Sequence, residues 1–239
     1  MSTRSSLTLK NYSFRKFQAA GNDFIFFTDP EILPLLTPEY IRHLCRRKFG
    51  IGADGLSVFY PVAPHVIKWV FFNSDATPAP ICGNALKCLA LILGEDCLIE
   101  GPLFSFPIQE KDGRLWIGLP PVTVRPLEEG LYHAALLNTH IIDITRTLCD
   151  PQLPAFASRL KKRYPDANIH FAENNCLRSF ERGVEEETLA CGSGAAALAT
   201  LSGHKEIVHK SGSITSFQSD HAGNLWMHGD AEHIFDGTL

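Results

Sequence analysis

The sequence predicts a mixed α/β (α+β) protein made of two similar domains. Its 239 residues suffice for one large domain or two small ones. Short strand-like segments alternate with a few helical segments, and the proline-rich stretch "LPPVTVRP" (119–126) separates two halves. Each half runs from strands through a polar loop to a Cys-Gly pair and a helix. This repeated order indicates two related domains whose helix starts could face each other across a cleft.

The first half begins with two predicted strands, 14–19 and 23–28, which are broken by the turn "AGN". Residues 37–49 predict an amphipathic helix, because Thr37 is a favourable N-cap and Pro38 stands at the first helical position. The helix places apolar side chains on one face, at Tyr40, Ile41, Leu44 and Cys45.

The next segment joins a glycine-rich turn, "GIGADG" (50–55), to two predicted strands, 56–62 and 65–73. A polar loop, 74–80, follows. Residues 83–93 are apolar nearly all round, so we expect a helix buried inside the domain.

The remaining elements complete the first half and build the second. Residues 104–119 carry Asp-Gly near their centre and predict a hairpin. An amphipathic helix is expected near 153–164, and another helix after Cys191. Several short strands end the chain. The strands predicted in the second half lie near 132–137, 140–146, 168–173 and 177–181.

Composition excludes several classes of protein. A net charge of −4 offers no electrostatic basis for binding nucleic acid or an anionic membrane. No apolar run approaches the roughly 20 residues of a membrane helix. The polar residues 1–10 lack the apolar segment of a secretory signal and are expected to form a frayed extension. Seven cysteines, an odd number without disulfide-like spacing, indicate reduced thiols in the cytoplasm.

Two cysteines stand apart from the rest, in "PICGNAL" (80–86) and "TLACGSG" (188–194). Each precedes a glycine and a predicted helix. Free N–H groups at a helix start bind anions and stabilise a thiolate, so we expect the pKa of both thiols to lie below the ordinary value. Two such thiols facing one cleft supply a base and an acid. One takes a proton from the carbon beside a bound carboxylate, and the other returns a proton from the opposite face, which inverts the centre without a cofactor.

An isolated cysteine is usually a small buried hydrophobic residue, and no spacing here is typical of a metal site. The matched contexts of Cys82 and Cys191 favour reactive thiols, because the glycine after each gives a ligand room to approach the backbone. We assign no chemistry to the other five cysteines, which are Cys45, Cys88, Cys97, Cys149 and Cys176.

Several motifs in order along the chain resemble the diaminopimelate epimerase family: "GNDF" (21–24), "FGIGADG" (49–55), "FN-x-D…CGN" (72–84), "N-x-H" (138–140) and "ERGV…ETLACGSG" (181–194). The resemblance implies two similar α/β domains, each a mostly antiparallel sheet curled around a central helix, with the active site in the cleft between them. We place the domains at 1–118 plus 229–239 and at 119–228. The resemblance further implies cofactor-independent conversion of LL- to meso-diaminopimelate, a precursor of lysine and peptidoglycan.

The resemblance also assigns roles to individual residues. Cys82 and Cys191 match the thiol pair, with His140 and Glu181 as polar partners that tune their proton affinity. Arg182 matches the arginine that recognises the distal end of the substrate. The remaining matches bind the substrate's amino acid groups through side-chain amides and backbone N–H groups, and they are Asn22, Asn73, Asn138, Asn168, Gly83, Asn84, Gly192 and Ser193.

Four segments depart from the family pattern. The chain has "DATP" (75–78) for "DGSE", "CGNALKC" (82–88) for "CGNG-x-R-C", and "LNTH" (137–140) for "GNPH". "ERGVEEET" (181–188) is one residue longer than "ERGVGET". These changes leave two alternatives open: a racemase for another amino acid such as glutamate, proline or hydroxyproline, and a binding module without catalysis. The expected ligand is in each case a small amino acid, no metal or cofactor is expected, and a homodimer is possible.

Overall fold

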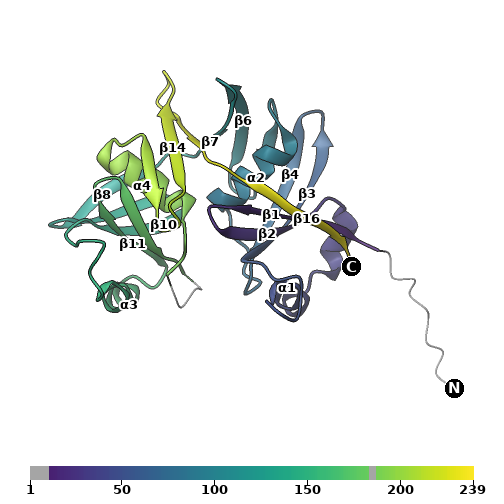
Figure 1. Ribbon diagram of the computed structural model, residues 1–239. Coiled ribbons are helices and arrows are strands. Elements are labelled where there is room, and N and C mark those ends of the chain that lie inside the picture. Colours follow the sequence, from purple (N-terminus) through teal and green to yellow (C-terminus); the bar gives the residue numbers. More distant parts are fainter. Residues whose placement is uncertain (1–10, 183–186) are drawn as a thin grey trace.

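A computed structural model describes residues 11–182 and 187–239 (Figure 1). The expected frayed extension (1–10) and the centre of the altered segment 181–188 lie outside the described residues. The first half contains β1 (Ser13–Ala19), β2 (Asn22–Phe27), β3 (Gly55–Ala63), β4 (Val66–Asn73), β5 (Leu98–Glu100), β6 (Ser105–Lys111) and β7 (Arg114–Gly118). The second half contains β8 (Thr123–Glu128), β9 (Leu131–Leu136), β10 (Asn138–Asp143), β11 (Ala167–Glu173), β12 (Cys176–Phe180), β13 (Glu206–His209), β14 (Ile214–Ser219) and β15 (Leu225–His228), followed by β16 (Glu232–Thr238).

The helices connect these strands. They are the 3-10 helix η1 (Pro30–Leu35) and the α-helices α1 (Pro38–Cys45), α2 (Gly83–Leu93), α3 (Leu153–Arg163) and α4 (Gly192–Ser202). Among the described residues, no helix combines the length and the hydropathy needed to cross a membrane.

The two halves of the sheet contain equivalent strands in the same spatial order, counted from each edge inward. The whole order runs β16-β1-β2-β3-β4-β5-β6-β7-β15-β14-β13-β12-β11-β10-β9-β8, so β1 to β7 occupy the positions that β9 to β15 occupy in the other half. The parallel pairs also correspond: β2/β3 and β4/β5 in one half, β10/β11 and β12/β13 in the other. A helix joins each parallel pair, since parallel strands need a crossover. The self-similarity of the sequence is thus a structural repeat.

The two copies form two lobes (Figure 1). Helix α2 lies with β1 to β4 in one lobe, and α4 lies with β8, β10 and β11 in the other. The last strand, β16, returns to the first lobe and pairs antiparallel with β1. The sheet is mostly antiparallel, as the fold class predicts. The domain limits given above stay a prediction.

Most predicted elements are present, but α1 ends at Cys45 and not at residue 49. The reason lies in the glycine-rich turn after the helix. Gly52 donates its backbone N–H to the carbonyl of Leu44, and Ala53 donates to Cys45. These bonds satisfy carbonyls that another helical turn would otherwise use, so the chain leaves the helix early.

Two strands were not predicted. β5 is only three residues long and therefore gives little periodic signal. β8 forms inside the proline-rich stretch, which we interpreted as a connection. It lies at the edge of the sheet, which is where a strand tolerates a proline such as Pro126.

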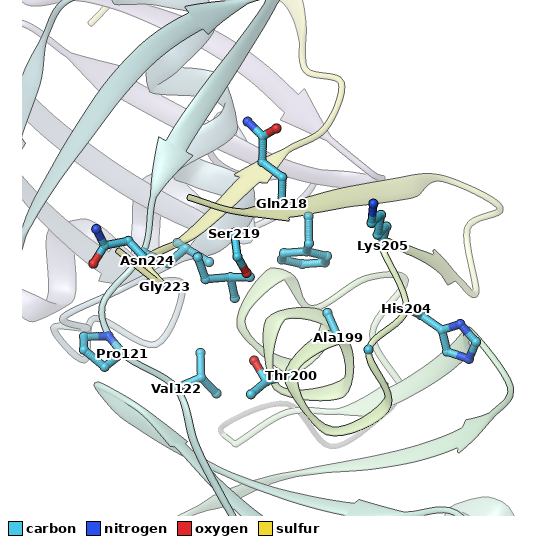
Figure 2. A pocket seen from close by; sticks show the side chains of 14 residues that line it. Pro121, Val122, Ala199, Thr200, His204, Lys205, Gln218, Ser219, Gly223 and Asn224 are labelled. Carbon is cyan, nitrogen blue, oxygen red and sulfur yellow. The ribbon is translucent and has the colours of Figure 1, made fainter. Parts of the chain in front are cut away.

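The far end of α4 borders a hollow of about 640 Å³ (Figure 2). Ala199 and Thr200 from the end of the helix line it together with Val122 and Ser219. None of the residues predicted for the active site lines this hollow. The chemistry predicted from the two Cys-Gly pairs belongs to the opposite end of α4.

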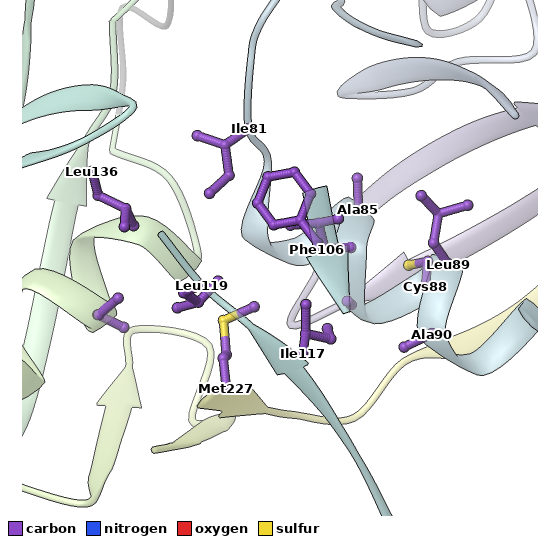
Figure 3. Packing of buried hydrophobic residues seen from close by; sticks show 14 of the residues in the cluster. Ile81, Ala85, Cys88, Leu89, Ala90, Phe106, Ile117, Leu119, Leu136 and Met227 are labelled. Carbon is purple, nitrogen blue, oxygen red and sulfur yellow. The ribbon is translucent and has the colours of Figure 1, made fainter. Parts of the chain in front are cut away.

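One hydrophobic cluster joins the two halves (Figure 3). It contains Ala85 and Leu89 of α2 together with Ala196 of α4, and Leu119 and Met227 lie between the lobes. Nearly every residue in the first two turns of α2 is buried, which confirms the predicted central helix. Because the cluster is continuous, the relative position of α2 and α4 is set by close packing.

Removing one side chain from α2 should test this packing. Leu86 is fully buried, so Leu86→Ala should lower the free energy of unfolding by about 3 kcal/mol. Leu91 in the same helix is 48% exposed, and Leu91→Ala should lower it by less than about 0.5 kcal/mol. Urea unfolding of both variants provides the measurement, and equal losses would contradict a buried central helix.

Candidate active site

Cys82 and Cys191 occupy equivalent positions in the two lobes. Each is the N-cap residue of its helix, α2 or α4, and both adopt extended backbone angles that nearly coincide: φ −139° and ψ 106° for Cys82, φ −130° and ψ 107° for Cys191. This backbone conformation is typical of N-cap residues. The structural repeat therefore presents two thiols at two matching helix starts.

The two helix starts touch each other at their first residues. A Cβ atom added to Gly83 would lie 2.9 Å from the Cα of Gly192, and one added to Gly192 would lie 3.0 Å from the Cα of Gly83. The prediction that these glycines give a ligand room is therefore incomplete. Their first physical requirement is the contact between the helices, since any side chain here would push the thiols apart.

A cavity of about 290 Å³ opens at this contact. Its walls come from both lobes, and they include Pro78 to Ile81 before α2. The cavity brings together every predicted site residue except His140. The predicted residues that line it are Asn22, Asn73, Cys82, Gly83, Asn84, Asn138, Asn168, Glu181, Arg182, Cys191, Gly192 and Ser193.

The electrostatics of the thiols differ from the sequence prediction. Burial raises the pKa of Cys82 to about 12, although the backbone N–H groups of Ala85 and Asn84 lower it. Burial also raises the pKa of Cys191 well above its ordinary value, and the carboxylate of Glu181 adds to this effect. The expected lowering is thus wrong in this structure. The helix start acts in the predicted direction, but desolvation of the charged form is the larger effect.

Glu181 is the polar partner of Cys191. Burial raises the pKa of this carboxyl group, whereas hydrogen bonds from Cys191 and Thr188 lower it. A carboxyl and a thiol with raised pKa values lie in direct contact, so a proton can pass between them. The hydroxyl of Ser193 lies 3.6 Å from the Cys191 sulfur on the other side.

A chain of amides and carboxylates orients the wall near Cys82. The Asn84 side chain donates to Asn22 Oδ1 at 2.6 Å, and Asn22 donates to Asp54 Oδ2 at 3.1 Å. Arg47 holds the other oxygen of Asp54 at 2.8 Å. Asp54 is a positioning residue that sequence reasoning missed. It belongs to "GIGADG", which we interpreted only as a turn.

His140 does not line the cavity and is fully buried behind it. Its Nε2 lies 2.8 Å from Asn138 Oδ1, and its Nδ1 lies 2.9 Å from His170 Nε2. His170 Nδ1 in turn lies 2.9 Å from Ser179 Oγ. Because an amide oxygen only accepts, His140 donates to Asn138, His170 donates to His140, and Ser179 donates to His170. His140 thus fixes the amide of Asn138, and its predicted effect on the thiols stays a prediction.

Burial keeps the imidazoles of His140 and His170 neutral. Burial lowers the pKa of His140 to about 3 and that of His170 well below its ordinary value. Within the described residues, His140, His170 and Cys191 form the one group with metal-ligating chemistry, their ligand atoms all lying within 4.8 Å of one another. The ring nitrogens of both histidines already take part in hydrogen bonds, so a metal ion would have to break these bonds in order to bind.

Charged side chains mark the mouth of the cavity. Arg182 lies 3.7 Å from Asp166, and both side chains are largely exposed. The backbone N–H of Arg182 donates to Asn168 Oδ1 at 2.8 Å, which fixes the start of the segment that carries the guanidinium. Asp166 was not predicted, because a single aspartate in a turn gives no sequence signal.

The chain is similar to known proteins in both sequence and fold. The sequence profile of the diaminopimelate epimerase family matches residues 14–101. The chain is 30% identical to the diaminopimelate epimerases of Prochlorococcus marinus, over 95% of this chain and 92% of that protein, and of Flavobacterium psychrophilum, over 94% and 98%. Its fold is similar to that of a hydroxyproline epimerase from Agrobacterium vitis, with a TM-score of 0.66 over 97% of this chain and 93% of that one, at 11% identity.

These similarities define the class first: the chain is an isomerase enzyme with the two-lobed epimerase fold. More particularly, it belongs to the diaminopimelate epimerase family. The resemblance drawn from the motifs is thereby confirmed, while the roles of individual residues stay predictions.

The buried histidines make stability depend on pH. The pKa of His140 and of His209 is lowered by burial to about 3, and that of His170 is also lowered. The unfolded chain therefore binds more protons below its ordinary histidine pKa of about 6.5, and stability falls as the pH falls. Each such group should lower the free energy of unfolding by about 1.4 kcal/mol between pH 7.5 and 5.5, and three groups by about 4 kcal/mol.

Urea unfolding at the two pH values measures this loss. Glu181, whose pKa is raised, acts in the opposite sense but is a single group. The control is His209→Gln, which removes one buried imidazole and should reduce the loss by about 1.4 kcal/mol. An equal loss in that variant would contradict the assignment.

Proposed function

We propose that this protein interconverts LL- and meso-diaminopimelate by proton transfer at the α-carbon, without a cofactor. The observation that carries the proposal is the pair of thiols, Cys82 and Cys191, at matching helix starts on one cavity. An inversion needs a base and an acid on opposite faces of one carbon, and a two-fold arrangement of equal groups meets that need. The reaction would supply a precursor of lysine and of peptidoglycan.

The reacting carboxylate is best held by the two helix starts. The backbone N–H groups that follow Cys82 and Cys191 lie at the positive ends of α2 and α4, and they converge where Gly83 meets Gly192. An anion at this point would neutralise both ends at once. The α-carbon beside it would then lie between the two sulfurs.

The proton path begins at Cys191. Its contact with Glu181 lets the carboxylate accept the thiol proton, which leaves a thiolate. The thiolate takes the α-proton, and the thiol of Cys82 delivers its own proton to the other face. The reverse reaction uses the same groups in exchanged roles.

The mouth of the cavity favours a substrate with charge of both signs at its distal end. Arg182 suits a carboxylate, and Asp166 beside it suits an ammonium group. Diaminopimelate carries both groups at its second amino acid centre. Glutamate and proline carry no distal ammonium, so this pair supports diaminopimelate over glutamate or proline as the substrate.

The central test is α-proton exchange in D₂O, followed by NMR, with LL-diaminopimelate, meso-diaminopimelate and L-glutamate and without added cofactor. We expect exchange with inversion on both diaminopimelates. Cys82→Ala and Cys191→Ala should each abolish inversion, because each lacks one of the two proton carriers.

Cys88→Ala is the matched control. Cys88 lies in the same helix as Cys82 and is fully buried in the hydrophobic cluster, so its loss should lower stability but leave turnover intact. Absence of exchange on every substrate, from folded and reduced protein, would refute the proposal. Exchange on glutamate alone would favour the racemase.

A second test concerns specificity at the mouth. Asp166→Asn should lower kcat/KM for diaminopimelate by up to about fivefold, which corresponds to the roughly 1 kcal/mol of an exposed charge pair. 2-Aminopimelate lacks the distal ammonium, and its kcat/KM should be unaffected by the substitution. Equal effects on both compounds would show that Asp166 does not contact the ammonium group.

A further inference from the structure

Lys87 is a buried lysine for which the proposed reaction has no use. It lies on α2, three residues after Asn84, with 3% of its surface exposed. Burial lowers the pKa of its ammonium to about 8. A buried cation destabilises a fold unless its hydrogen bonds are satisfied, so the partners of Lys87 show what this residue does.

The ammonium group has two named partners, one in each half of the molecule. Nζ donates to Asn84 Oδ1 at 3.2 Å and to Thr215 Oγ1 at 2.8 Å. Asn84 is the second residue of α2 in the first lobe, and Thr215 lies on β14 of the second half. Lys87 therefore joins the central helix of one lobe to the sheet of the other, directly behind the cavity wall.

The backbone closes over this contact. A Cβ atom added to Gly229, between β15 and β16, would lie 2.8 Å from Lys87 Cε and 2.9 Å from Nζ. The enclosure leaves the ammonium little freedom to find other acceptors. The side chain of Lys87 is therefore confined by its neighbours, as an apolar core side chain would be.

The bond to Lys87 decides which way the amide of Asn84 points. An ammonium group only donates, so it must face the amide oxygen. The NH₂ group of Asn84 is then turned to Asn22 Oδ1 at 2.6 Å and to the carbonyl of Ala190 at 3.3 Å. Asn22 and Asn84 both line the cavity, and Ala190 precedes Cys191.

We propose that Lys87 is a positioning residue of the active site, which holds the carboxamide of Asn84 in the orientation that orders Asn22 and the approach to Cys191. It acts through Asn84 and touches no substrate. The inference rests on the proposed function for its kinetic test, but the orientation of Asn84 can be observed without turnover.

Lys87→Met removes the ammonium group and keeps a side chain of similar length. We expect kcat/KM for diaminopimelate to fall about tenfold, the effect of losing one charge-assisted hydrogen bond. Lys87→Gln keeps an N–H donor and should lose less. The double variant Lys87→Met with Asn84→Ala should be no worse than Asn84→Ala alone, because both changes remove the same interaction.

Thr215→Val is the matched control. It deletes the other partner of Lys87 and leaves the bond to Asn84, so kcat/KM should stay within about twofold of the wild type while stability falls. If Thr215→Val and Lys87→Met lower kcat/KM equally, Lys87 has only a structural role and the inference is wrong.

A readout that does not need turnover separates the two proposals. The side-chain amide signal of Asn84 in a ¹⁵N–¹H NMR spectrum, assigned by its absence in Asn84→Ala, should shift or broaden in Lys87→Met and persist in Thr215→Val. An unchanged signal in Lys87→Met would overturn the inference about Lys87. An inactive wild type with the expected amide signals would overturn the proposed function alone.

Discussion

The rest of the site depends on the contact between the first residues of two helices. Gly83 and Gly192 approach so closely that neither has room for a side chain, and each follows the thiol that caps its helix. The contact sets where the two sulfurs lie and where two sets of free N–H groups converge. It is possible only because the chain builds one arrangement of strands and helices twice and packs the copies around one continuous cluster.

Two opposing electrostatic effects meet at the thiols. A helix start stabilises negative charge, and burial destabilises it, and here burial dominates at both Cys82 and Cys191. A site of this kind keeps its protons until a neighbouring base removes one. The contact of Cys191 with Glu181 makes the two otherwise similar thiols unequal. In the proposed reaction, Cys191 is therefore the thiol that first gives up its proton.

Polar side chains beside the cavity, of which His140 and Lys87 are buried, hold the amides in its wall. His140 fixes Asn138, Lys87 fixes Asn84, and Asp54 fixes Asn22, each through a hydrogen bond whose donor is determined by chemistry. An amide can donate or accept in either orientation, so a wall of amides recognises a ligand only if something else sets their direction. This need accounts for a buried histidine and a buried lysine at positions where apolar side chains would avoid the free-energy cost of desolvating a polar group.

The sequence by itself determined the fold class, the order of most elements and the matched positions of Cys82 and Cys191 before two helices, because these follow from periodicity, N-cap signals and local Cys-Gly motifs. The resemblance to the epimerase motifs supplied the thirteen predicted site residues, and twelve of them line one cavity. Only the tertiary structure decided that α1 stops at Cys45, that His140 lies behind the wall, and that Asp54, Asp166, His170 and Lys87 belong to the site. It also reversed the expected pKa shift of the thiols. Burial and partners far apart in the chain control these features, and neither can be read from neighbouring residues.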